Sequence, residues 1–223
     1  NLPADIKHLT KVSFINFAGN FISGTLPNEI QFMYNLNDLN LYTNSISGSI
    51  PIVLCFAHNL RNIALPGNGL SGTIPPEIGF LSNLLTLMLS YNALSGPIPS
   101  ELWTLPHLSS LILSGNDLTG DISTILESAI IPSTLYLNGN LFTGDIGPEI
   151  GSLTQLRTLS LGNSNITGPI PPEIGNLLQL ASLSISNSSI SGSIPDEIWN
   201  LINLTNLALI NNELVGTIPE AII

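Results

Sequence analysis

Apolar and polar residues alternate along this chain in a pattern that recurs every 24 residues. In each period three positions are Leu or a similar apolar residue, and a single polar or small residue separates the last two. Such alternation with a period of two is typical of a half-buried strand. Because the chain returns alongside itself after each period, we expect neighbouring strands to pair in parallel. The clearest examples are Leu36, Leu39 and Leu41, then Leu108, Leu111 and Leu113, then Leu156, Leu159 and Leu161.

A polar anchor residue follows each predicted strand. Its amide can donate to and accept from backbone groups that would otherwise be buried unpaired. Gly stands four residues after every anchor, and Pro stands seven residues after most of them, with Ser123 and Gly147 as exceptions. Nine glycines in one register indicate a solenoid of nine repeats. The anchors are Asn20, Asn44, Asn68, Asn92, Asn116, Asn140, Ser164, Ser188 and Asn212.

The segment after each glycine predicts a short helix. Residues 74–79, Ile-Pro-Pro-Glu-Ile-Gly, begin with residues that suit a first helical turn, because Pro loses no needed N–H there and the helix dipole favours an anion. A glutamate nine residues after the anchor recurs in six repeats, so much of the acidity belongs to the repeat itself. These residues are Glu29, Glu77, Glu101, Glu149, Glu173 and Glu197.

Residues 84–105, LLTLMLSYNALSGPIPSELWTL, and residues 156–177, LRTLSLGNSNITGPIPPEIGNL, resemble the plant-type leucine-rich repeat, LxxLxLxxNxLxGxIPxxIGxLxx. The resemblance implies an α/β solenoid: a right-handed superhelix with a concave parallel sheet, a short extra strand near the SGxIP segment and short convex helices. It also implies an extracellular or cell-surface protein that binds a protein or peptide and is not an enzyme. Receptor-like kinase ectodomains and polygalacturonase inhibitors share this repeat.

We expect one solenoid over residues 1–223, with residues 1–11 as the second half of a preceding repeat. Members of the family normally carry paired cysteines in caps at both ends, whereas Cys55 is the only cysteine here. Residues 217–223 stop halfway through a coil. A segment of a longer chain accounts for this, and end-to-end association of the uncapped apolar ends is the alternative.

Charge and composition exclude several classes of function. Four Lys and Arg against fifteen Asp and Glu give a net charge of −11, which leaves no basic surface for nucleic acid. No apolar run approaches the ~18–20 residues that a membrane span requires. We see no convergent catalytic set and expect no cofactor. A weak Ca²⁺ candidate is the pair Asp121 and Asp145, in adjacent repeats about one strand spacing (~5 Å) apart, although solvated carboxylates are the favoured interpretation.

Three N-x-S/T sequons predict glycosylation of an extracellular protein, at Asn165, Asn187 and Asn203. Two of them lie beside Ser164 and Ser188, where the anchor Asn is replaced.

The predicted partner-binding surface lies on the concave sheet. The position four residues before the anchor is mostly small or polar, but it carries three consecutive large residues, Met88, Ile112 and Tyr136. Contiguous exposed apolar residues with a polar rim are typical of an interface. The alternative is that an exposed strand simply tolerates residues that favour strands. Tyr42 and Tyr91 add aromatic rings on this side, and Arg61 and Arg157 are its only basic residues, so either could hold a carboxylate.

A different class of function, ice binding, is also open, because some antifreeze proteins are built on similar repeats. Its sequence sign would be a regular, flat Ser/Thr array. Part of one is present, but Pro97, Asp121, Asp145 and Pro169 interrupt it. The pairs are Ser23 and Thr25, Ser47 and Ser49, Ser71 and Thr73, and Ser191 and Ser193.

Overall fold

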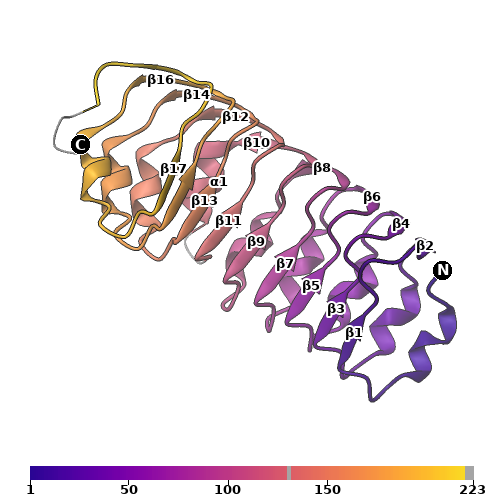
Figure 1. Cartoon of the computed structure of the whole chain (residues 1–223). Helices are drawn as coiled ribbons and strands as arrows, with labels where there is room; N and C mark the ends of the chain where they lie inside the picture. Colours follow the sequence, from indigo (N-terminus) through magenta and orange to yellow (C-terminus); the bar gives the residue numbers. More distant parts are fainter. Residues whose placement is uncertain (130–131, 219–223) are drawn as a thin grey trace. The chain divides into compact units, whose positions relative to one another are not determined.

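The computed structural model describes residues 1–129 and 132–218. The chain divides into two compact units, Asn1–Leu118 and Thr119–Ile223. In both units each repeat supplies one strand to a first sheet, then one strand to a second sheet, then a short helix (Figure 1). The structure therefore has the predicted solenoid fold with its strands, extra strands and helices.

The first sheet consists of three-residue parallel strands at the predicted leucine positions. Each residue pairs with the residue 24 positions later, as Ile15 does with Leu39, so equivalent positions line up across the sheet. The first unit contains β1 (Phe14–Asn16), β3 (Asp38–Asn40), β5 (Asn62–Ala64), β7 (Thr86–Met88) and β9 (Ser110–Ile112). The second unit contains β11 (Thr134–Tyr136), β13 (Thr158–Ser160), β15 (Ser182–Ser184) and β17 (Asn206–Ala208).

The second sheet is also parallel, but its register differs by two residues. Thr143 pairs with Asn165, 22 positions later, so equivalent positions of adjacent repeats are staggered instead of aligned. The strands before the unit boundary are β2 (Ser23–Gly24), β4 (Ser45–Gly48), β6 (Gly69–Gly72) and β8 (Ala93–Pro97), and β10 (Asp117–Asp121) spans the boundary. The second unit adds β12 (Leu141–Asp145), β14 (Asn165–Pro169), β16 (Ser189–Ser193) and β18 (Glu213–Val215).

The helices are single five-residue 3₁₀ turns in all but one described repeat. The repeated Pro is the residue before the helix in six of them and has an extended backbone. A further Pro occupies the first turn of η4, η6 and η7, where its missing N–H is harmless. The predicted glutamates do occupy the first turns. The helices are η1 (Ala4–His8), η2 (Asn28–Phe32), η3 (Ile52–Phe56), η4 (Pro76–Phe80), η5 (Ser100–Thr104), η6 (Pro148–Ser152), η7 (Pro172–Asn176) and η8 (Asp196–Asn200). Pro219 of the Pro series lies outside the described residues.

The exception follows from Ser123, one of the two residues that replace the repeated Pro. Ser123 has a backbone N–H, and this group donates to Asp121 Oδ1 at 2.9 Å. Asp121 therefore caps an α-helix, α1 (Ile122–Ser128), which begins two residues earlier in the repeat than the 3₁₀ helices do.

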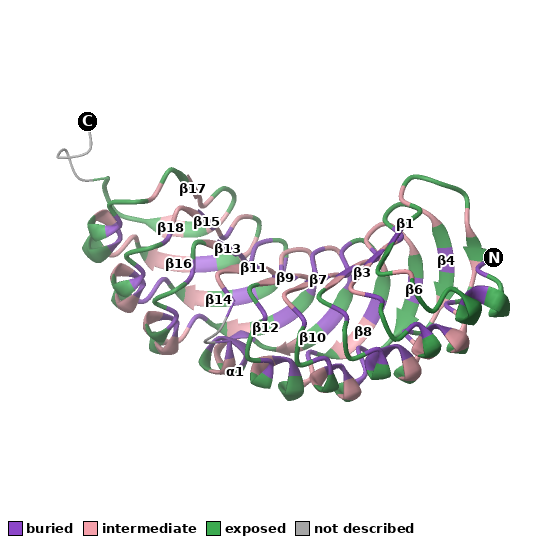
Figure 2. Ribbon diagram, turned by 90° about the horizontal axis from the view of Figure 1, so that it is seen from below, coloured by how far each residue is buried: buried purple, intermediate pink, exposed green. Residues whose placement is uncertain are grey.

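The core consists of the repeated leucines and isoleucines. Leu111 and Leu113 are fully buried, and the helices bury the side that faces the sheets and expose the other (Figure 2). The anchor asparagines hydrogen-bond adjacent repeats together, as predicted. Asn92 Nδ2 donates to the carbonyls of Leu65 at 3.1 Å and Leu89 at 2.9 Å, while its Oδ1 accepts from the Leu70 N–H at 3.0 Å.

Two adjacent repeats lack this arrangement, because Ser164 and Ser188 take the anchor position. Among the described residues, Ser164 Oγ and Ser188 Oγ are buried without a hydrogen-bond partner. A serine side chain is too short to join two repeats as Asn92 does. These repeats therefore forgo the bonds that the anchor makes elsewhere.

The residue before each anchor adopts a left-handed backbone in all nine repeats. Gly or Asn is expected there, since a Cβ is strained at positive φ. Thr43 (φ 51°) and Tyr91 (φ 54°) depart from this rule, and strain of this kind concentrates at functional sites. The other members are Gly19, Gly67, Gly115, Gly139, Asn163, Asn187 and Asn211.

Candidate recognition surface

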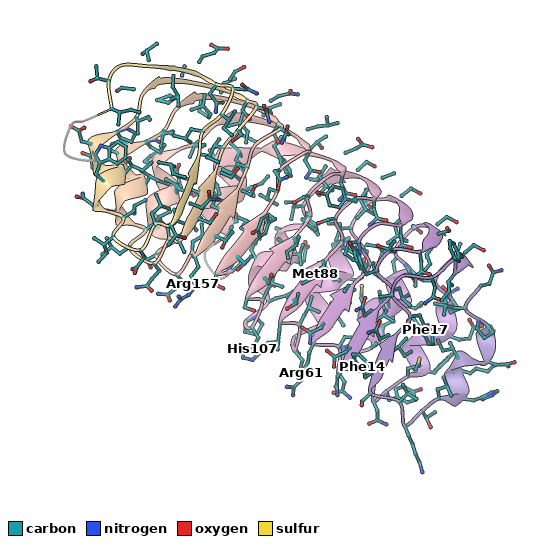
Figure 3. The ribbon with its side chains drawn as sticks, in the orientation of Figure 1. Phe14, Phe17, Arg61, Met88, His107 and Arg157 are labelled. Carbon is teal, nitrogen blue, oxygen red and sulfur yellow. The ribbon has the colours of Figure 1, made fainter. Side chains whose placement is uncertain are left out.

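Met88 and Ile112 are the last residues of the neighbouring strands β7 and β9, and their Cα atoms pair directly across the sheet. Each follows a buried leucine, Leu87 or Leu111, so the alternation of the strand turns both side chains outward. Both are half-buried. The structure thus brings these two predicted residues side by side on the outer face of the first sheet (Met88 in Figure 3).

Tyr91 extends this surface just beyond β7. It is 66% exposed, and a Cβ on Gly115 of the next repeat would stand 2.7 Å from Tyr91 Cδ1, so the ring lies across that glycine. Tyr42 lies two repeats earlier, just after β3, and is 51% exposed. Its backbone N–H donates to Asn40 Oδ1 at 3.1 Å. Both rings are accessible to a partner.

Tyr136 and Arg157 belong to the second unit. Tyr136 ends β11, is half-buried and pairs with Ser160 of β13. Arg157 lies just before β13 and its side chain is exposed. Its backbone carbonyl accepts from Ala181 at 2.8 Å and from Ser182 at 3.0 Å, which fixes the backbone from which the guanidinium extends.

In the first unit, Arg61 lies at the edge where the chain enters the first sheet, and Figure 3 shows His107 on the same edge. Neither Arg61 nor Arg157 has a side-chain hydrogen bond or ion pair with any residue that the structure describes. Both guanidinium groups are therefore available to an anionic group of a partner.

The two aspartates of the calcium candidate do not face each other. Because of the two-residue stagger, Asp121 pairs with Thr143, and Asp145 pairs with Thr167. The two aspartates are therefore diagonal neighbours on adjacent strands and not direct cross-strand partners. Asp121 accepts from Ser123 Oγ at 2.6 Å, which lowers the pKa of its carboxyl, and Asp145 accepts from the Thr167 hydroxyl. No three His, Cys, Asp or Glu side chains gather at metal-binding distance in residues 1–129 and 132–218.

The three sequons differ in their surroundings. Asn165 is exposed at the start of β14, and its amide has no hydrogen-bond partner in the described part of the chain. Asn187 is the middle of an asparagine ladder: its Nδ2 donates to Asn163 Oδ1 at 3.1 Å, and its Oδ1 accepts from Asn211 Nδ2 at 2.7 Å. Asn203 Nδ2 donates to the Leu178 carbonyl at 2.7 Å.

The hydroxyl groups of the ice-binding hypothesis gather on the second sheet of the first unit. Ser23, Ser47 and Ser71 are exposed, but they are not aligned, because Ser23 pairs with Ser45 and Ser71 with Ala93. Thr25, Ser49 and Thr73 are also exposed. The array is therefore an uncharged, staggered hydroxyl surface.

A further set of exposed aromatic residues lies on the helix side of the first unit, outside the surfaces predicted from the sequence. Phe32, Phe56 and Phe80 end η2, η3 and η4, and Tyr34 lies beside Phe32. Their 24-residue spacing is visible in the sequence. Only the structure shows that these side chains, at the ends of the helices, are exposed. Among the described helices, none has the length and apolarity that crossing a membrane requires.

Two family models match the chain. A leucine-rich repeat model matches residues 58–118, and a second leucine-rich repeat model matches residues 155–177 and 179–201. A search of curated proteins finds no match.

Solved structures of plant proteins are similar over nearly the whole chain. A TDR receptor has a TM-score of 0.93 and 30% identity, covering 99% of this chain and 38% of that one. The plant peptide hormone receptor RGFR1 in complex with RGF2 has a TM-score of 0.75 and 29% identity, covering 99% and 43%. A plant ice-binding protein has a TM-score of 0.84 and 28% identity, covering 98% and 70%. The chain thus spans about two fifths of the two receptor chains.

Periodicity, strand register, family models and solved structures agree on one architecture. The chain is a solenoid of leucine-rich repeats, similar to plant receptor ectodomains.

Proposed function

We propose that this chain is an extracellular recognition domain that binds a protein or peptide on the outer face of the first sheet. It acts by binding and not by catalysis. The observation that carries the proposal is the contiguous pair Met88 and Ile112 beside the strained, exposed Tyr91, whereas the outward residues of the preceding strands β3 and β5 are small or polar. Similarity to a peptide hormone receptor supports the same class of partner.

The expected binding energy is concentrated in a few residues. Aromatic and large apolar side chains dominate interface energetics, whereas neighbouring Ser and Asn residues contribute mainly by excluding water. Tyr42 and, in the second unit, Tyr136 are further candidate contacts. Arg61 or Arg157 would pair with a carboxylate of the partner, because neither guanidinium has a partner within the described protein.

The test is alanine substitution at Met88, Ile112, Tyr91 and Tyr136, with binding to a purified partner measured by calorimetry. Each substitution that removes a desolvated interface side chain should cost about 1–3 kcal/mol of binding free energy. Ser110→Ala, on the same strand as Ile112, is the matched control and should be nearly neutral. Wild-type affinity in all four variants would place the recognition surface elsewhere.

Ice binding is a second candidate, favoured by one specific observation. The chain covers 70% of the plant ice-binding protein, a larger share than it covers of the receptors reported above. The exposed hydroxyl array of the first unit would be the contact surface. Against it, Pro97, Asp121, Asp145 and Pro169 replace the hydroxyl residues in the middle of the series.

Thermal hysteresis of the protein in buffer tests this candidate. Activity that Ser47→Tyr abolishes would support it, because a bulky ring at the centre of the array prevents flat contact. A reading equal to the buffer baseline would dismiss it. Asn200→Tyr, at the exposed end of η8 and outside the hydroxyl array, serves as the control.

A further inference from the structure

The helix side of the first unit exposes a row of phenylalanines that the repeat does not need. Phe32, Phe56 and Phe80 are 41%, 40% and 54% exposed. The equivalent residue is polar in the later repeats: Thr104, Ser128, Ser152, Asn176 and Asn200. Because the same solenoid forms with polar residues at this position, packing of the repeat does not explain the aromatic ones.

The polar residues have a local role that phenylalanine cannot take. Thr104 Oγ1 donates to the Glu101 carbonyl at 2.7 Å, and Ser152 Oγ donates to the Glu149 carbonyl at 2.7 Å, so each closes its own helix. Each phenylalanine contacts another aromatic ring instead. The rings of Phe56 and Phe80 are stacked with centroids 6.1 Å apart, and the Phe32 ring meets Tyr34 edge to face at 6.4 Å. These two aromatic pairs, at the ends of three consecutive helices, are called here the phenylalanine row (Phe32, Tyr34, Phe56 and Phe80).

Carboxylates flank this row. Side chains three residues apart overlie each other in a 3₁₀ helix, so Glu29 lies over Phe32 and Glu77 over Phe80. Between residues 12 and 118 the sequence contains one basic residue other than histidine, Arg61, which lies at the entrance to the first sheet and not on a helix. Glu29 and Glu77 thus place two carboxylates beside the row, while the neighbouring helix η1 carries Lys7 and His8 in its last turn.

We propose that the phenylalanine row is a docking surface for a cationic amphipathic segment of another protein. Apolar side chains of that segment would pack on the rings, and its Lys or Arg groups would meet Glu29 and Glu77 and the faces of the rings. A second copy of this chain fits poorly, because each copy carries a net charge of −11 and would bring glutamates against glutamates. This surface is separate from the first-sheet face of the proposed function.

The test uses a synthetic peptide of leucine and lysine with its leucines on one helical face, titrated into the protein and followed by fluorescence anisotropy. The double variant Phe56→Ser, Phe80→Asn takes residues that the chain itself uses at equivalent positions, so the fold should tolerate it. We expect it to weaken binding about tenfold or more. Glu29→Gln with Glu77→Gln should also weaken binding and reduce its dependence on salt.

Leu178→Ser is the matched control, because Leu178 is an equally exposed apolar residue (52%) beside a helix of the second unit. It should leave binding unchanged, and a peptide of leucine and glutamate should not bind. Hydrogen exchange of the wild-type complex gives a readout without any substitution, namely protection of residues 28–32, 52–56 and 76–80.

Three outcomes would overturn the proposal. One is no binding of the cationic peptide, and another is equal loss of binding in the Leu178→Ser control. The third is a dimer in light scattering that the double phenylalanine variant dissociates, since the row would then be the contact between two copies.

Discussion

The ring of Tyr91 lies across Gly115, and both residues hold the left-handed position before the anchor in consecutive repeats. Tyr91 takes this conformation at a cost, since a left-handed backbone disfavours a bulky side chain by about 1–2 kcal/mol. Asn occupies the same position at residues 163, 187 and 211. Tyr91→Asn should therefore raise the free energy of unfolding by about 0.5–1 kcal/mol in urea titration, while it weakens partner binding. Loss of stability instead would mean that the ring is chiefly structural.

Adjacent residues on β9 should separate stability from binding. Leu111 is fully buried, so Leu111→Ala should cost about 2–5 kcal/mol of unfolding free energy. Ile112 turns outward, and Ile112→Ala should change stability by about 0.5 kcal/mol or less while it weakens partner binding. Urea midpoints of the two variants check the contrast. Equal losses would show that Ile112 is a core residue.

Restoring a missing anchor should stabilise the second unit. Ser164→Asn supplies the amide that Asn92 uses to join its neighbours, and each net hydrogen bond contributes about 0.5–1.5 kcal/mol. We expect a gain of about 1–3 kcal/mol in urea unfolding. The reverse change, Asn92→Ser, should cost at least as much. A neutral Ser164→Asn would indicate that solvent already satisfies the backbone groups of that repeat.

Glycans should differ among the sequons. Asn165 is exposed with an unengaged amide, whereas the amide of Asn187 bonds on both sides within the ladder with Asn163 and Asn211. Peptide mass spectrometry of secreted protein should find a glycan on Asn165 and little or none on Asn187. Asn187→Gln should also lower stability, because it breaks two ladder bonds. Full occupancy of Asn187 would contradict the intact ladder.

Cys55 should report on opening of the first unit. The thiol is fully buried, and burial raises its pKa to about 12. The folded state therefore holds this proton more tightly than the unfolded chain, so the contribution of Cys55 to stability is complete below pH 9 and falls as pH rises from there toward 12. Iodoacetamide should label Cys55 only after denaturation, and Leu54→Ala, next to it in the core, should speed labelling. Rapid labelling of the native wild type would contradict this burial.

The sequence by itself determined the repeat and its core. The short parallel strands and their buried faces follow from the 24-residue period, the leucines in a fixed register and the anchor asparagine. Every coil must bury its apolar side chains and pair its backbone groups, so the same residues recur in each. The outward direction of Met88 and Ile112 follows from the same alternation. Of the two residues that replace the repeated Pro, Ser123 lies in the one described α-helix, whereas Gly147 precedes an ordinary 3₁₀ helix.

Only the tertiary structure decided relations between repeats. The second sheet is staggered by two residues, which makes Asp121 and Asp145 diagonal neighbours and offsets the hydroxyls from one another, and no single repeat contains that information. The left-handed backbone of Tyr91, the ladder around Asn187 and the exposure of Phe56 and Phe80 likewise depend on what the next coil places beside each residue. The period of the sequence determines whether a position is buried or exposed within its repeat, whereas strand register and packing determine which residues of the next repeat it contacts.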